Sequence, residues 1–190
     1  MLLLEDKIRD KSAAIAVVGL GYVGLPLAVS FSEAEFTVLG FDILHKRVQA
    51  VNNRQSYIAD VDSQRITFSA TVRQSQLRDM DIVCICVPTP LTKQKQPDLQ
   101  YIIKETKVIT RYMIKPQLIV LESTTYPGTV REIMLPILEN KGQRTLGKDF
   151  YLSHVPERID PGNSVWSLRS IPKIVGGVDN ESTELTRLLY

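Results

Sequence analysis

The residues that indicate chemistry most clearly lie between Ala14 and Ala28. A short apolar run there ends in a G-x-G-x-x-G pattern, and an apolar pattern at helical spacing follows at once. In such a strand, turn and helix, the first glycine permits a sharp turn, the second leaves room for a pyrophosphate and the third allows close packing. The free amides at the helix start attract the phosphates. The pattern therefore predicts a dinucleotide site formed by Gly19, Leu20, Gly21, Tyr22, Val23 and Gly24.

A carboxylate stands where such a site needs one. The apolar run Phe36 to Phe41 ends in Asp42, which follows Gly19 at close to the ~20-residue spacing expected of an acid that binds a ribose hydroxyl. An ionised Asp42 would also repel a 2′-phosphate, which favours NAD over NADP. Lys46 and Arg47 weaken that preference, because a nearby cation could accommodate the phosphate. The alternative is a plain β-α-β unit with an acidic turn, but strand, glycines, helix and acid in this order favour the NAD site.

Length and composition fit one globular domain. A chain of 190 residues can bury a full hydrophobic core, and its 44% hydrophobic and 23% charged residues are ordinary values. The net charge is +2 and the basic residues are scattered, so we expect no nucleic-acid partner. The apolar start Met1 to Leu4 is too short for a signal sequence, and no run approaches membrane-spanning length. We therefore expect a cytoplasmic protein with no membrane contact.

Two cysteines are interpreted as reduced core thiols. Cys84 and Cys86 alternate within the apolar run Ile82 to Val87, so both side chains face the same side of a strand and are poorly placed to pair. No histidine or further cysteine lies at the spacing of a metal ligand. We therefore expect no metal site.

The positioning elements alternate along the chain. Helices are expected over about 44–52, 99–113, 130–141 and 181–190, with strands over 65–70, 81–87, 118–121, 150–155 and 173–175. This alternation predicts an α/β fold with a doubly wound, mainly parallel sheet of the Rossmann-like, dinucleotide-binding type. The expected organisation is an N-terminal extension (1–13), an NAD-binding domain (14–179) and the start of a helix (180–190) that leads to a central domain absent from this chain.

Four expected strands end in polar, proline or glycine residues: Gly19, Pro88, Glu122 and Pro156. In a parallel sheet these carboxyl ends share one edge, and ligands bind there. The four ends should therefore meet at a single site.

Together, these strand ends resemble the UDP-glucose/GDP-mannose dehydrogenase family. The matching stretches are Gly19 to Pro26, Val87 to Pro90, Glu122 to Thr129 and Pro156 to Asn163. The last two look most like the branch that oxidises UDP-N-acetylhexosamines to uronic acids for surface polysaccharides. The resemblance runs from about Ile15 to the chain end and covers the family's N-terminal dinucleotide-binding domain.

This resemblance implies a chemistry. Family enzymes oxidise the C6 alcohol of the sugar to a carboxylate with two NAD molecules, through an aldehyde, a cysteine thioester and its hydrolysis. The nucleophilic cysteine, a lysine, an asparagine, the helical dimer-forming segment and the nucleotide-sugar domain are expected beyond Tyr190. The chain alone should therefore bind NAD without converting a UDP-sugar, and the full-length parent should be a homodimer.

The same resemblance implies roles for individual residues. Gly19 to Gly24 would hold the pyrophosphate. Asp42 and Arg47 would flank the adenosine ribose, and Pro88 and Thr89 would line the ADP-ribose cleft. Ser123 and Thr124 would lie near the nicotinamide ribose and the reacting carbon, which makes Thr124 a catalytic candidate. Glu157 would be the acid–base or water-positioning group, and Arg158 would lie beside the sugar nucleotide.

Structural interpretations of these residues stay open. Glu157 could be a strand-end acid paired with Arg158 or Arg169. Thr124 could cap a helix that starts near Pro127, a role compatible with catalysis.

The residues before Pro156 depart from the family's pattern. Val155 replaces the usual small hydroxyl residue, which removes a polar contact beside the expected site. His154 could act as a base, but a lone histidine at a strand end is more often only hydrogen-bonded.

Two other functions share part of these features. A stand-alone NAD(H)-binding regulatory module needs the glycine turn and Asp42 but neither Thr124 nor Glu157. A 3-hydroxyacid or 6-phosphogluconate type dehydrogenase shares the first β-α-β unit but lacks the two later motifs. Retention of the Pro156 to Asn163 stretch favours the nucleotide-sugar enzyme.

Overall fold

A mainly parallel sheet forms the centre of the molecule. The computed structural model describes residues 3–157 and 171–190, and within these the strand order is β3-β2-β1-β4-β5-β6-β7. The six strands from β3 to β6 are parallel, and β7 pairs antiparallel with β6. This is the doubly wound Rossmann order expected from the alternating elements. The strands are β1 (Ala14–Val18), β2 (Thr37–Phe41), β3 (Ser69–Thr71), β4 (Ile82–Ile85), β5 (Gln117–Leu121), β6 (Phe150–His154) and β7 (Gly176–Gly177).

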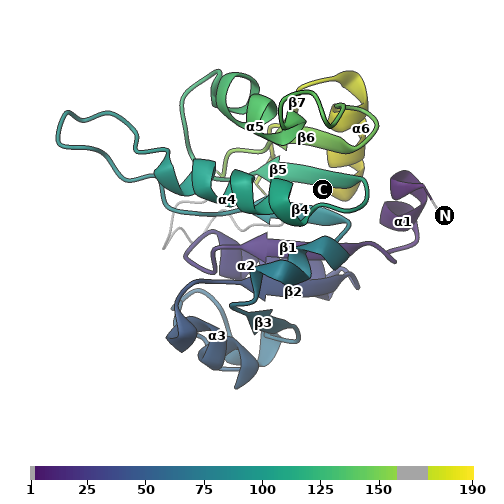
Figure 1. Ribbon diagram of the computed structural model, residues 1–190. Helices are drawn as coiled ribbons and strands as arrows, with labels where there is room; N and C mark the ends of the chain where they lie inside the picture. Colours follow the sequence, from purple (N-terminus) through teal and green to yellow (C-terminus); the bar gives the residue numbers. More distant parts are fainter. Residues whose placement is uncertain (1–2, 158–170) are drawn as a thin grey trace.

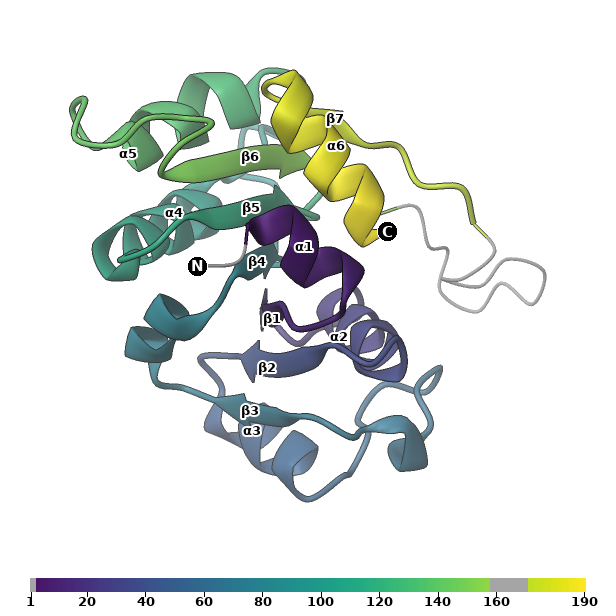
Figure 2. The ribbon, with the colours of Figure 1, turned by 90° about the vertical axis from the view of Figure 1, so that its right-hand side faces the viewer.

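Helices cover both faces of the sheet (Figure 1). In Figure 2, α1, α2 and α6 lie on one face, and α4 and α5 lie on the other. The α-helices are α1 (Leu4–Arg9), α2 (Gly24–Glu33), α3 (His45–Asn52), α4 (Gln100–Tyr112), α5 (Leu135–Glu139) and α6 (Asn180–Leu189). Shorter turns are the 3₁₀ segments η1 (Ser63–Arg65) and η2 (Gln74–Asp79) and the π-helical segment η3 (Thr129–Met134). None of the helices in the described ranges is long and apolar enough to cross a membrane.

Each central strand contributes side chains to two hydrophobic cores, one on each face of the sheet. Ile15 and Val17 of β1 belong to the cluster under α2 and α6, whereas Ala16 and Val18 belong to the cluster under α4 and α5. A strand that is buried on both faces has no polar side, which explains the near-continuous apolar runs in the sequence.

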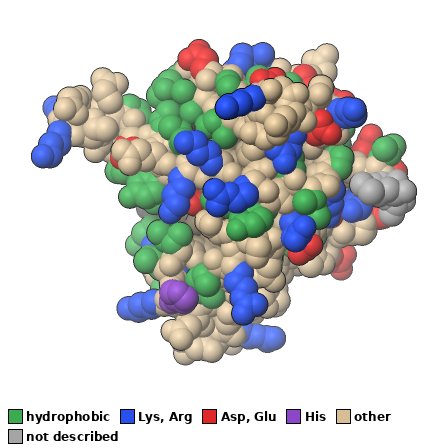
Figure 3. Space-filling model, viewed as in Figure 1, with side chains coloured by type: hydrophobic (Ala, Val, Ile, Leu, Met, Phe, Trp, Pro, Cys, Tyr) green, Lys and Arg blue, Asp and Glu red, His purple; other side chains and the backbone are tan. Residues whose placement is uncertain are grey.

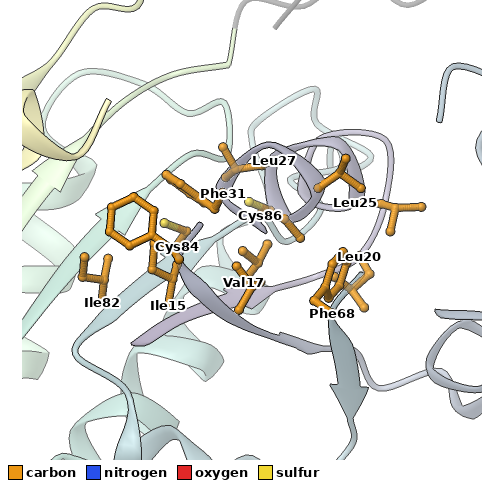
Figure 4. Close-up of a cluster of buried hydrophobic side chains, with 14 of the residues drawn as sticks. Ile15, Val17, Leu20, Leu25, Leu27, Phe31, Phe68, Ile82, Cys84 and Cys86 are labelled. Atoms are coloured by element: carbon orange, nitrogen blue, oxygen red, sulfur yellow. The ribbon is translucent and has the colours of Figure 1, made fainter. Parts of the chain in front are cut away.

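Cys84 of β4 and Cys86, which follows the strand, lie in the first of these cores. Cys84 and Cys86 are buried and unpaired, among the side chains of α2 (Figure 4). Burial raises the pKa of both thiols, which keeps them protonated and unreactive. Their interpretation as core thiols is confirmed. In the described part of the chain, no group of three histidine, cysteine or acidic side chains could hold a metal ion.

Three expected elements differ in the structure. The strand expected over 65–70 is shorter and forms only at Ser69–Thr71, since Arg65 belongs to η1. The strand expected over 173–175 is absent, and the last strand is instead Gly176–Gly177, because these residues pair with Ser153 and His154 at the edge of the sheet. The helix expected over 130–141 is divided into η3 and α5. Pro136 explains the division, since it lacks an N–H and its ring would clash with a carbonyl one turn earlier, so the helix widens there.

The segment before β1 is attached to the sheet by a buried carboxylate. Asp81 is 5% exposed and accepts hydrogen bonds from the Ala14 N–H at 3.0 Å, from Lys7 Nζ at 2.7 Å and from Lys115 Nζ at 2.8 Å. Burial alone would raise the pKa of Asp81, but these hydrogen bonds outweigh it and hold the pKa below the usual value. Ile8 of α1 is fully buried beside them, so α1 packs onto the domain.

We predict that Asp81→Asn lowers the free energy of unfolding at pH 7 by about 2 kcal/mol, because both lysines lose their anionic partner. The pKa of Asp81 is lowered in the folded state, so its contribution is complete above the unfolded value of about 3.9 and disappears as the pH falls through the folded value. The difference between the two proteins should therefore narrow below about pH 4. Urea unfolding from pH 7 to pH 3 measures it. The exposed Asp79→Asn is the control, and an equal gap at every pH would contradict the prediction.

Candidate functional site

The glycine turn after β1 is closely packed. Gly19 has φ +93° and its N–H donates to the Phe41 carbonyl at 2.7 Å, which fixes the turn beside the end of β2. A Cβ on Gly19 would lie 2.6 Å from the Cys86 carbonyl oxygen, and a Cβ on Gly24 would lie 1.8 Å from the Gly19 carbonyl oxygen. Both contacts are with backbone and too short for any side chain. Gly24 is therefore required chiefly by the turn itself, in addition to the helix–strand packing that its spacing suggested.

The second glycine has the opposite environment. A Cβ on Gly21 would meet nothing within 4 Å, and Gly21 lines a cleft of about 750 Å³. Among the described residues, no side chain caps α2, and the N–H groups of Tyr22 and Val23, two turn residues that line the cleft, donate no hydrogen bond. The turn thus forms a concave surface, and a Cβ on Gly21 would occupy part of the space that it leaves open to the cleft.

Asp42 stands next to this turn, held by its neighbours. Its Oδ2 accepts from the Leu20 N–H at 2.9 Å and from Arg47 Nη1 at 3.1 Å, and its Oδ1 accepts from the Leu44 N–H at 2.9 Å. A carboxylate has about four acceptor positions, so one remains for a ribose hydroxyl. Tyr57, which sequence analysis missed, supports the arrangement because its hydroxyl donates to the Leu20 carbonyl at 2.7 Å and its ring lies near Arg47.

One cleft of about 750 Å³ joins the ends of β1, β2, β4 and β5, a size typical of a small-molecule site. It brings together most of the predicted cofactor residues: Gly19, Gly21, Tyr22, Val23, Asp42, Arg47, Pro88, Thr89, Ser123 and Thr124. Leu20, Gly24 and Glu157 do not line it, and the side chain of Leu20 is fully buried in the core. Leu20 therefore faces the site only through its backbone.

The ends of β4 and β5 are tied to each other at this cleft. Thr89 Oγ1 donates to the Thr124 carbonyl at 2.8 Å, and Ser123 Oγ donates to the Val87 carbonyl at 2.7 Å. Ser123 is buried and Thr124 is exposed. Thr124 does not cap a helix, because the following helical segment begins at Thr129 without a side-chain cap. The capping alternative for Thr124 is therefore wrong, and its side chain lies at the cleft.

A buried ionic cluster lies at the ends of β5 and β6, beside the cleft. Lys173 Nζ contacts Glu157 Oε2 at 2.9 Å and Glu122 Oε2 at 3.4 Å. Glu122 is fully buried, and the Tyr190 hydroxyl donates to its Oε1. The described partner of Glu157 is thus Lys173; Arg158 and Arg169, the partners that the sequence suggested, lie outside the described residues.

The sequence pattern predicted Glu122 at the end of a strand, without a role in the site. It predicted Lys173 as part of a strand. Burial raises the pKa of Glu122 to about 7, although Lys173 and the Tyr190 hydroxyl act in the opposite direction. An acid directly after a fully apolar strand was the available signal for Glu122. Nothing local identified Lys173, because its partners are distant in sequence.

His154 and Val155 occupy structural positions. His154 Nε2 lies 3.3 Å from the Ser123 carbonyl, and burial lowers the pKa of the ring. Val155 is fully buried in the core. These contacts agree with the interpretation of His154 as a hydrogen-bonded strand-end residue.

The model of the UDP-glucose/GDP-mannose dehydrogenase family, NAD binding domain, matches residues 13–190 of this chain. The chain belongs to this family. It is 36% identical to Protein CapL of Staphylococcus aureus, over 93% of this chain and 42% of the relative. It is also 36% identical to UDP-N-acetyl-D-glucosamine 6-dehydrogenase of Pseudomonas aeruginosa, over 95% of this chain and 43% of the relative.

A solved structure agrees with the sequence comparison. NDP-N-acetyl-D-galactosaminuronic acid dehydrogenase from Methanosarcina mazei superposes with a TM-score of 0.85 and 32% identity, over all of this chain and 44% of that one. The chain therefore spans less than half the length of these relatives and corresponds to the NAD binding domain of the family.

We predict that Gly24→Ala lowers the free energy of unfolding by about 3 kcal/mol, because the new methyl group would overlap the Gly19 carbonyl oxygen. Alanine is the better helix former, so propensity alone predicts the opposite sign. Gly21→Ala is the matched control, since its methyl group meets open space. Urea unfolding compares the two variants. Equal stabilities would show that the contact is not tight in solution.

We also predict that Glu122→Gln gains stability relative to the unsubstituted chain as the pH rises from 5 to 8. The pKa of Glu122 is about 7 in the folded state against an ordinary 4.5, so its contribution is complete below the ordinary value and is lost as the pH rises through 7. Glutamine does not titrate. Unfolding free energies across this range test the sign, with the exposed Glu184→Gln as control. Parallel pH profiles for all three proteins would contradict it.

Proposed function

We propose that this chain binds NAD in the 750 Å³ cleft and is the cofactor domain of an enzyme that oxidises the C6 alcohol of a UDP-N-acetylhexosamine to a uronic acid. The observation that carries the proposal is the glycine turn. Its open Gly21 faces the cleft, and the Asp42 carboxylate stands beside it. Family membership supports the cofactor, and the names of the relatives support the substrate class.

The residues present fit the cofactor. The N–H groups of Tyr22 and Val23, which have no acceptor among the described residues, suit a pyrophosphate, and Gly21 leaves the space that it needs. The remaining acceptor position of Asp42 suits a ribose hydroxyl, whereas a 2′-phosphate would meet its negative charge. Arg47 is engaged by Asp42 at 3.1 Å, which reduces its capacity to compensate that charge. NAD is therefore favoured over NADP.

The groups proposed for the chemistry lie at the end of β5, where Ser123 and Thr124 line the cleft, and in the ionic cluster beside it. NAD supplies a hydride acceptor when it is bound. Pro88 and Thr89 would line the ADP-ribose part of the cleft, and Ser123 and Thr124 would hold the nicotinamide ribose, with Thr124 toward the reacting carbon. Glu157 would accept a proton or position water, and Lys173 would fix its carboxylate through the 2.9 Å contact. Arg158, proposed to contact the sugar nucleotide, lies outside the described residues.

The whole enzyme is part of the same proposal. Relatives named as UDP-N-acetyl-D-glucosamine and UDP-N-acetyl-D-mannosamine dehydrogenases support a UDP-N-acetylhexosamine as substrate. We propose a homodimer that works in the cytoplasm, where the unpaired thiols of Cys84 and Cys86 stay reduced. Basic side chains are spread among other side chains on the face shown in Figure 3, which gives no reason to propose a nucleic-acid partner.

We predict that the chain binds NAD more tightly than NADP and that Gly21→Ala weakens NAD binding at least about tenfold, or 1.4 kcal/mol. The methyl group would occupy the space proposed for the pyrophosphate, while the fold has room for it. Isothermal titration calorimetry measures both affinities, and urea unfolding checks that Gly21→Ala keeps the stability of the unsubstituted chain. Absence of heat on titration of the unsubstituted chain with NAD, or unchanged affinity in a folded Gly21→Ala variant, would contradict the proposal.

A further inference from the structure

A polar pair lies in the cleft on the side of β3. Glu105 of α4 and Gln74 of η2 both line it, and Gln74 Nε2 donates to Glu105 Oε2 at 3.3 Å. The pair joins two elements that follow different strands, since η2 comes after β3 and α4 comes after β4. Neither residue was singled out by the glycine motif or by the strand ends.

The sheet order indicates which part of a dinucleotide reaches this pair. The glycine turn follows β1, Asp42 follows β2, and β3 lies beyond β2 at the edge of the sheet. The proposed ribose position at Asp42 therefore lies between the pyrophosphate cradle and the Gln74 side of the cleft. Phe41, Val72 and Leu77 also line the cleft and supply apolar surface for a flat ring. This part of the cleft matches an adenine base.

Glu105 is suited to accept a hydrogen bond there. It is only 5% exposed, and within the described residues its Oε1 accepts no hydrogen bond. Burial raises the pKa of the carboxyl, and the charge of Lys104, which also lines the cleft, acts against it. A partly desolvated carboxylate of this kind is stabilised by a ligand N–H that replaces the lost water.

We propose that Glu105 accepts a hydrogen bond from the exocyclic amine of adenine and selects an adenine dinucleotide over one with a 6-oxo purine. This rests on the proposed binding of NAD. Adenine presents an amine at its 6-position, whereas hypoxanthine presents a carbonyl oxygen. That oxygen would face the carboxylate, and the two acceptors would repel each other while Glu105 Oε1 stays without a donor.

The test compares NAD with nicotinamide hypoxanthine dinucleotide, in which a carbonyl oxygen replaces the 6-amine and the neighbouring N1 carries a hydrogen. Titration calorimetry of the full chain should show at least tenfold weaker binding of the hypoxanthine form. In Glu105→Gln the ratio should fall below about threefold, because an amide can accept from the amine or donate to the carbonyl oxygen. Glu184→Gln, which changes an exposed glutamate of α6 outside the cleft, should keep the full ratio.

The outcomes separate this inference from the proposed function. If the unsubstituted chain binds NAD but binds the hypoxanthine form equally well, the inference is overturned and NAD binding stands; this arm needs no variant to fold. If the chain discriminates and folded Glu105→Gln keeps the ratio, another group recognises the amine and the inference is also overturned. If neither dinucleotide binds, the proposed function fails and the inference fails with it.

Discussion

The contact between the Gly19 carbonyl and the backbone of Gly24 sets the geometry on which the rest of the site depends. Because no Cβ intervenes, α2 begins directly after the turn that follows β1, and the turn residues Tyr22 and Val23 line the cleft. The N–H of Gly19 is bonded to the Phe41 carbonyl, so the same turn is locked to the end of β2. Asp42 follows Phe41 directly, so its position is fixed by the same hydrogen bond. One close backbone approach thus places the phosphate cradle and the ribose acid together.

A second constraint is electrostatic and lies beside the cleft. Two buried carboxylates, Glu122 and Glu157, share the ammonium group of Lys173. Burial raises the pKa of Glu122, and the negative charge of Glu157 adds to the rise, while Lys173 acts against it. Glu157 makes the shorter contact with the lysine, at 2.9 Å against 3.4 Å for Glu122. The arrangement leaves the carboxylate with the proposed chemical role firmly oriented.

Local patterns predicted the features that depend on neighbouring residues. The glycine turn, Asp42 and the apolar central strands follow from spacing and hydrophobicity, and the structure has the expected sheet order. The pairing of Lys173 with Glu122 depends on residues far apart in the sequence, so no local pattern contains it. The same holds for the short β7, which exists only because β6 offers an edge.

Side-chain direction was the other limit of sequence analysis. Leu20 lies inside the glycine motif, yet its side chain turns into the core and packs near Gly40. Pro136 was visible in the sequence, but the helix expected over 130–141 continues through it as η3 and α5, with a widened turn instead of a plain break. The sequence thus indicated which residues lie at the site more reliably than whether each residue faces it with its side chain or its backbone.

The Asp81 network lies at the amino ends of the strands, opposite the cleft. It joins the amino end of β4 to α1 and to the start of β5, whereas the glycine turn and the ionic cluster lie at the carboxyl ends. The amino ends of the strands therefore carry contacts that stabilise the fold, and the carboxyl ends carry the residues proposed to bind ligands. Substitutions at the amino ends offer a way to raise or lower the stability of the domain without changing the shape of the cleft.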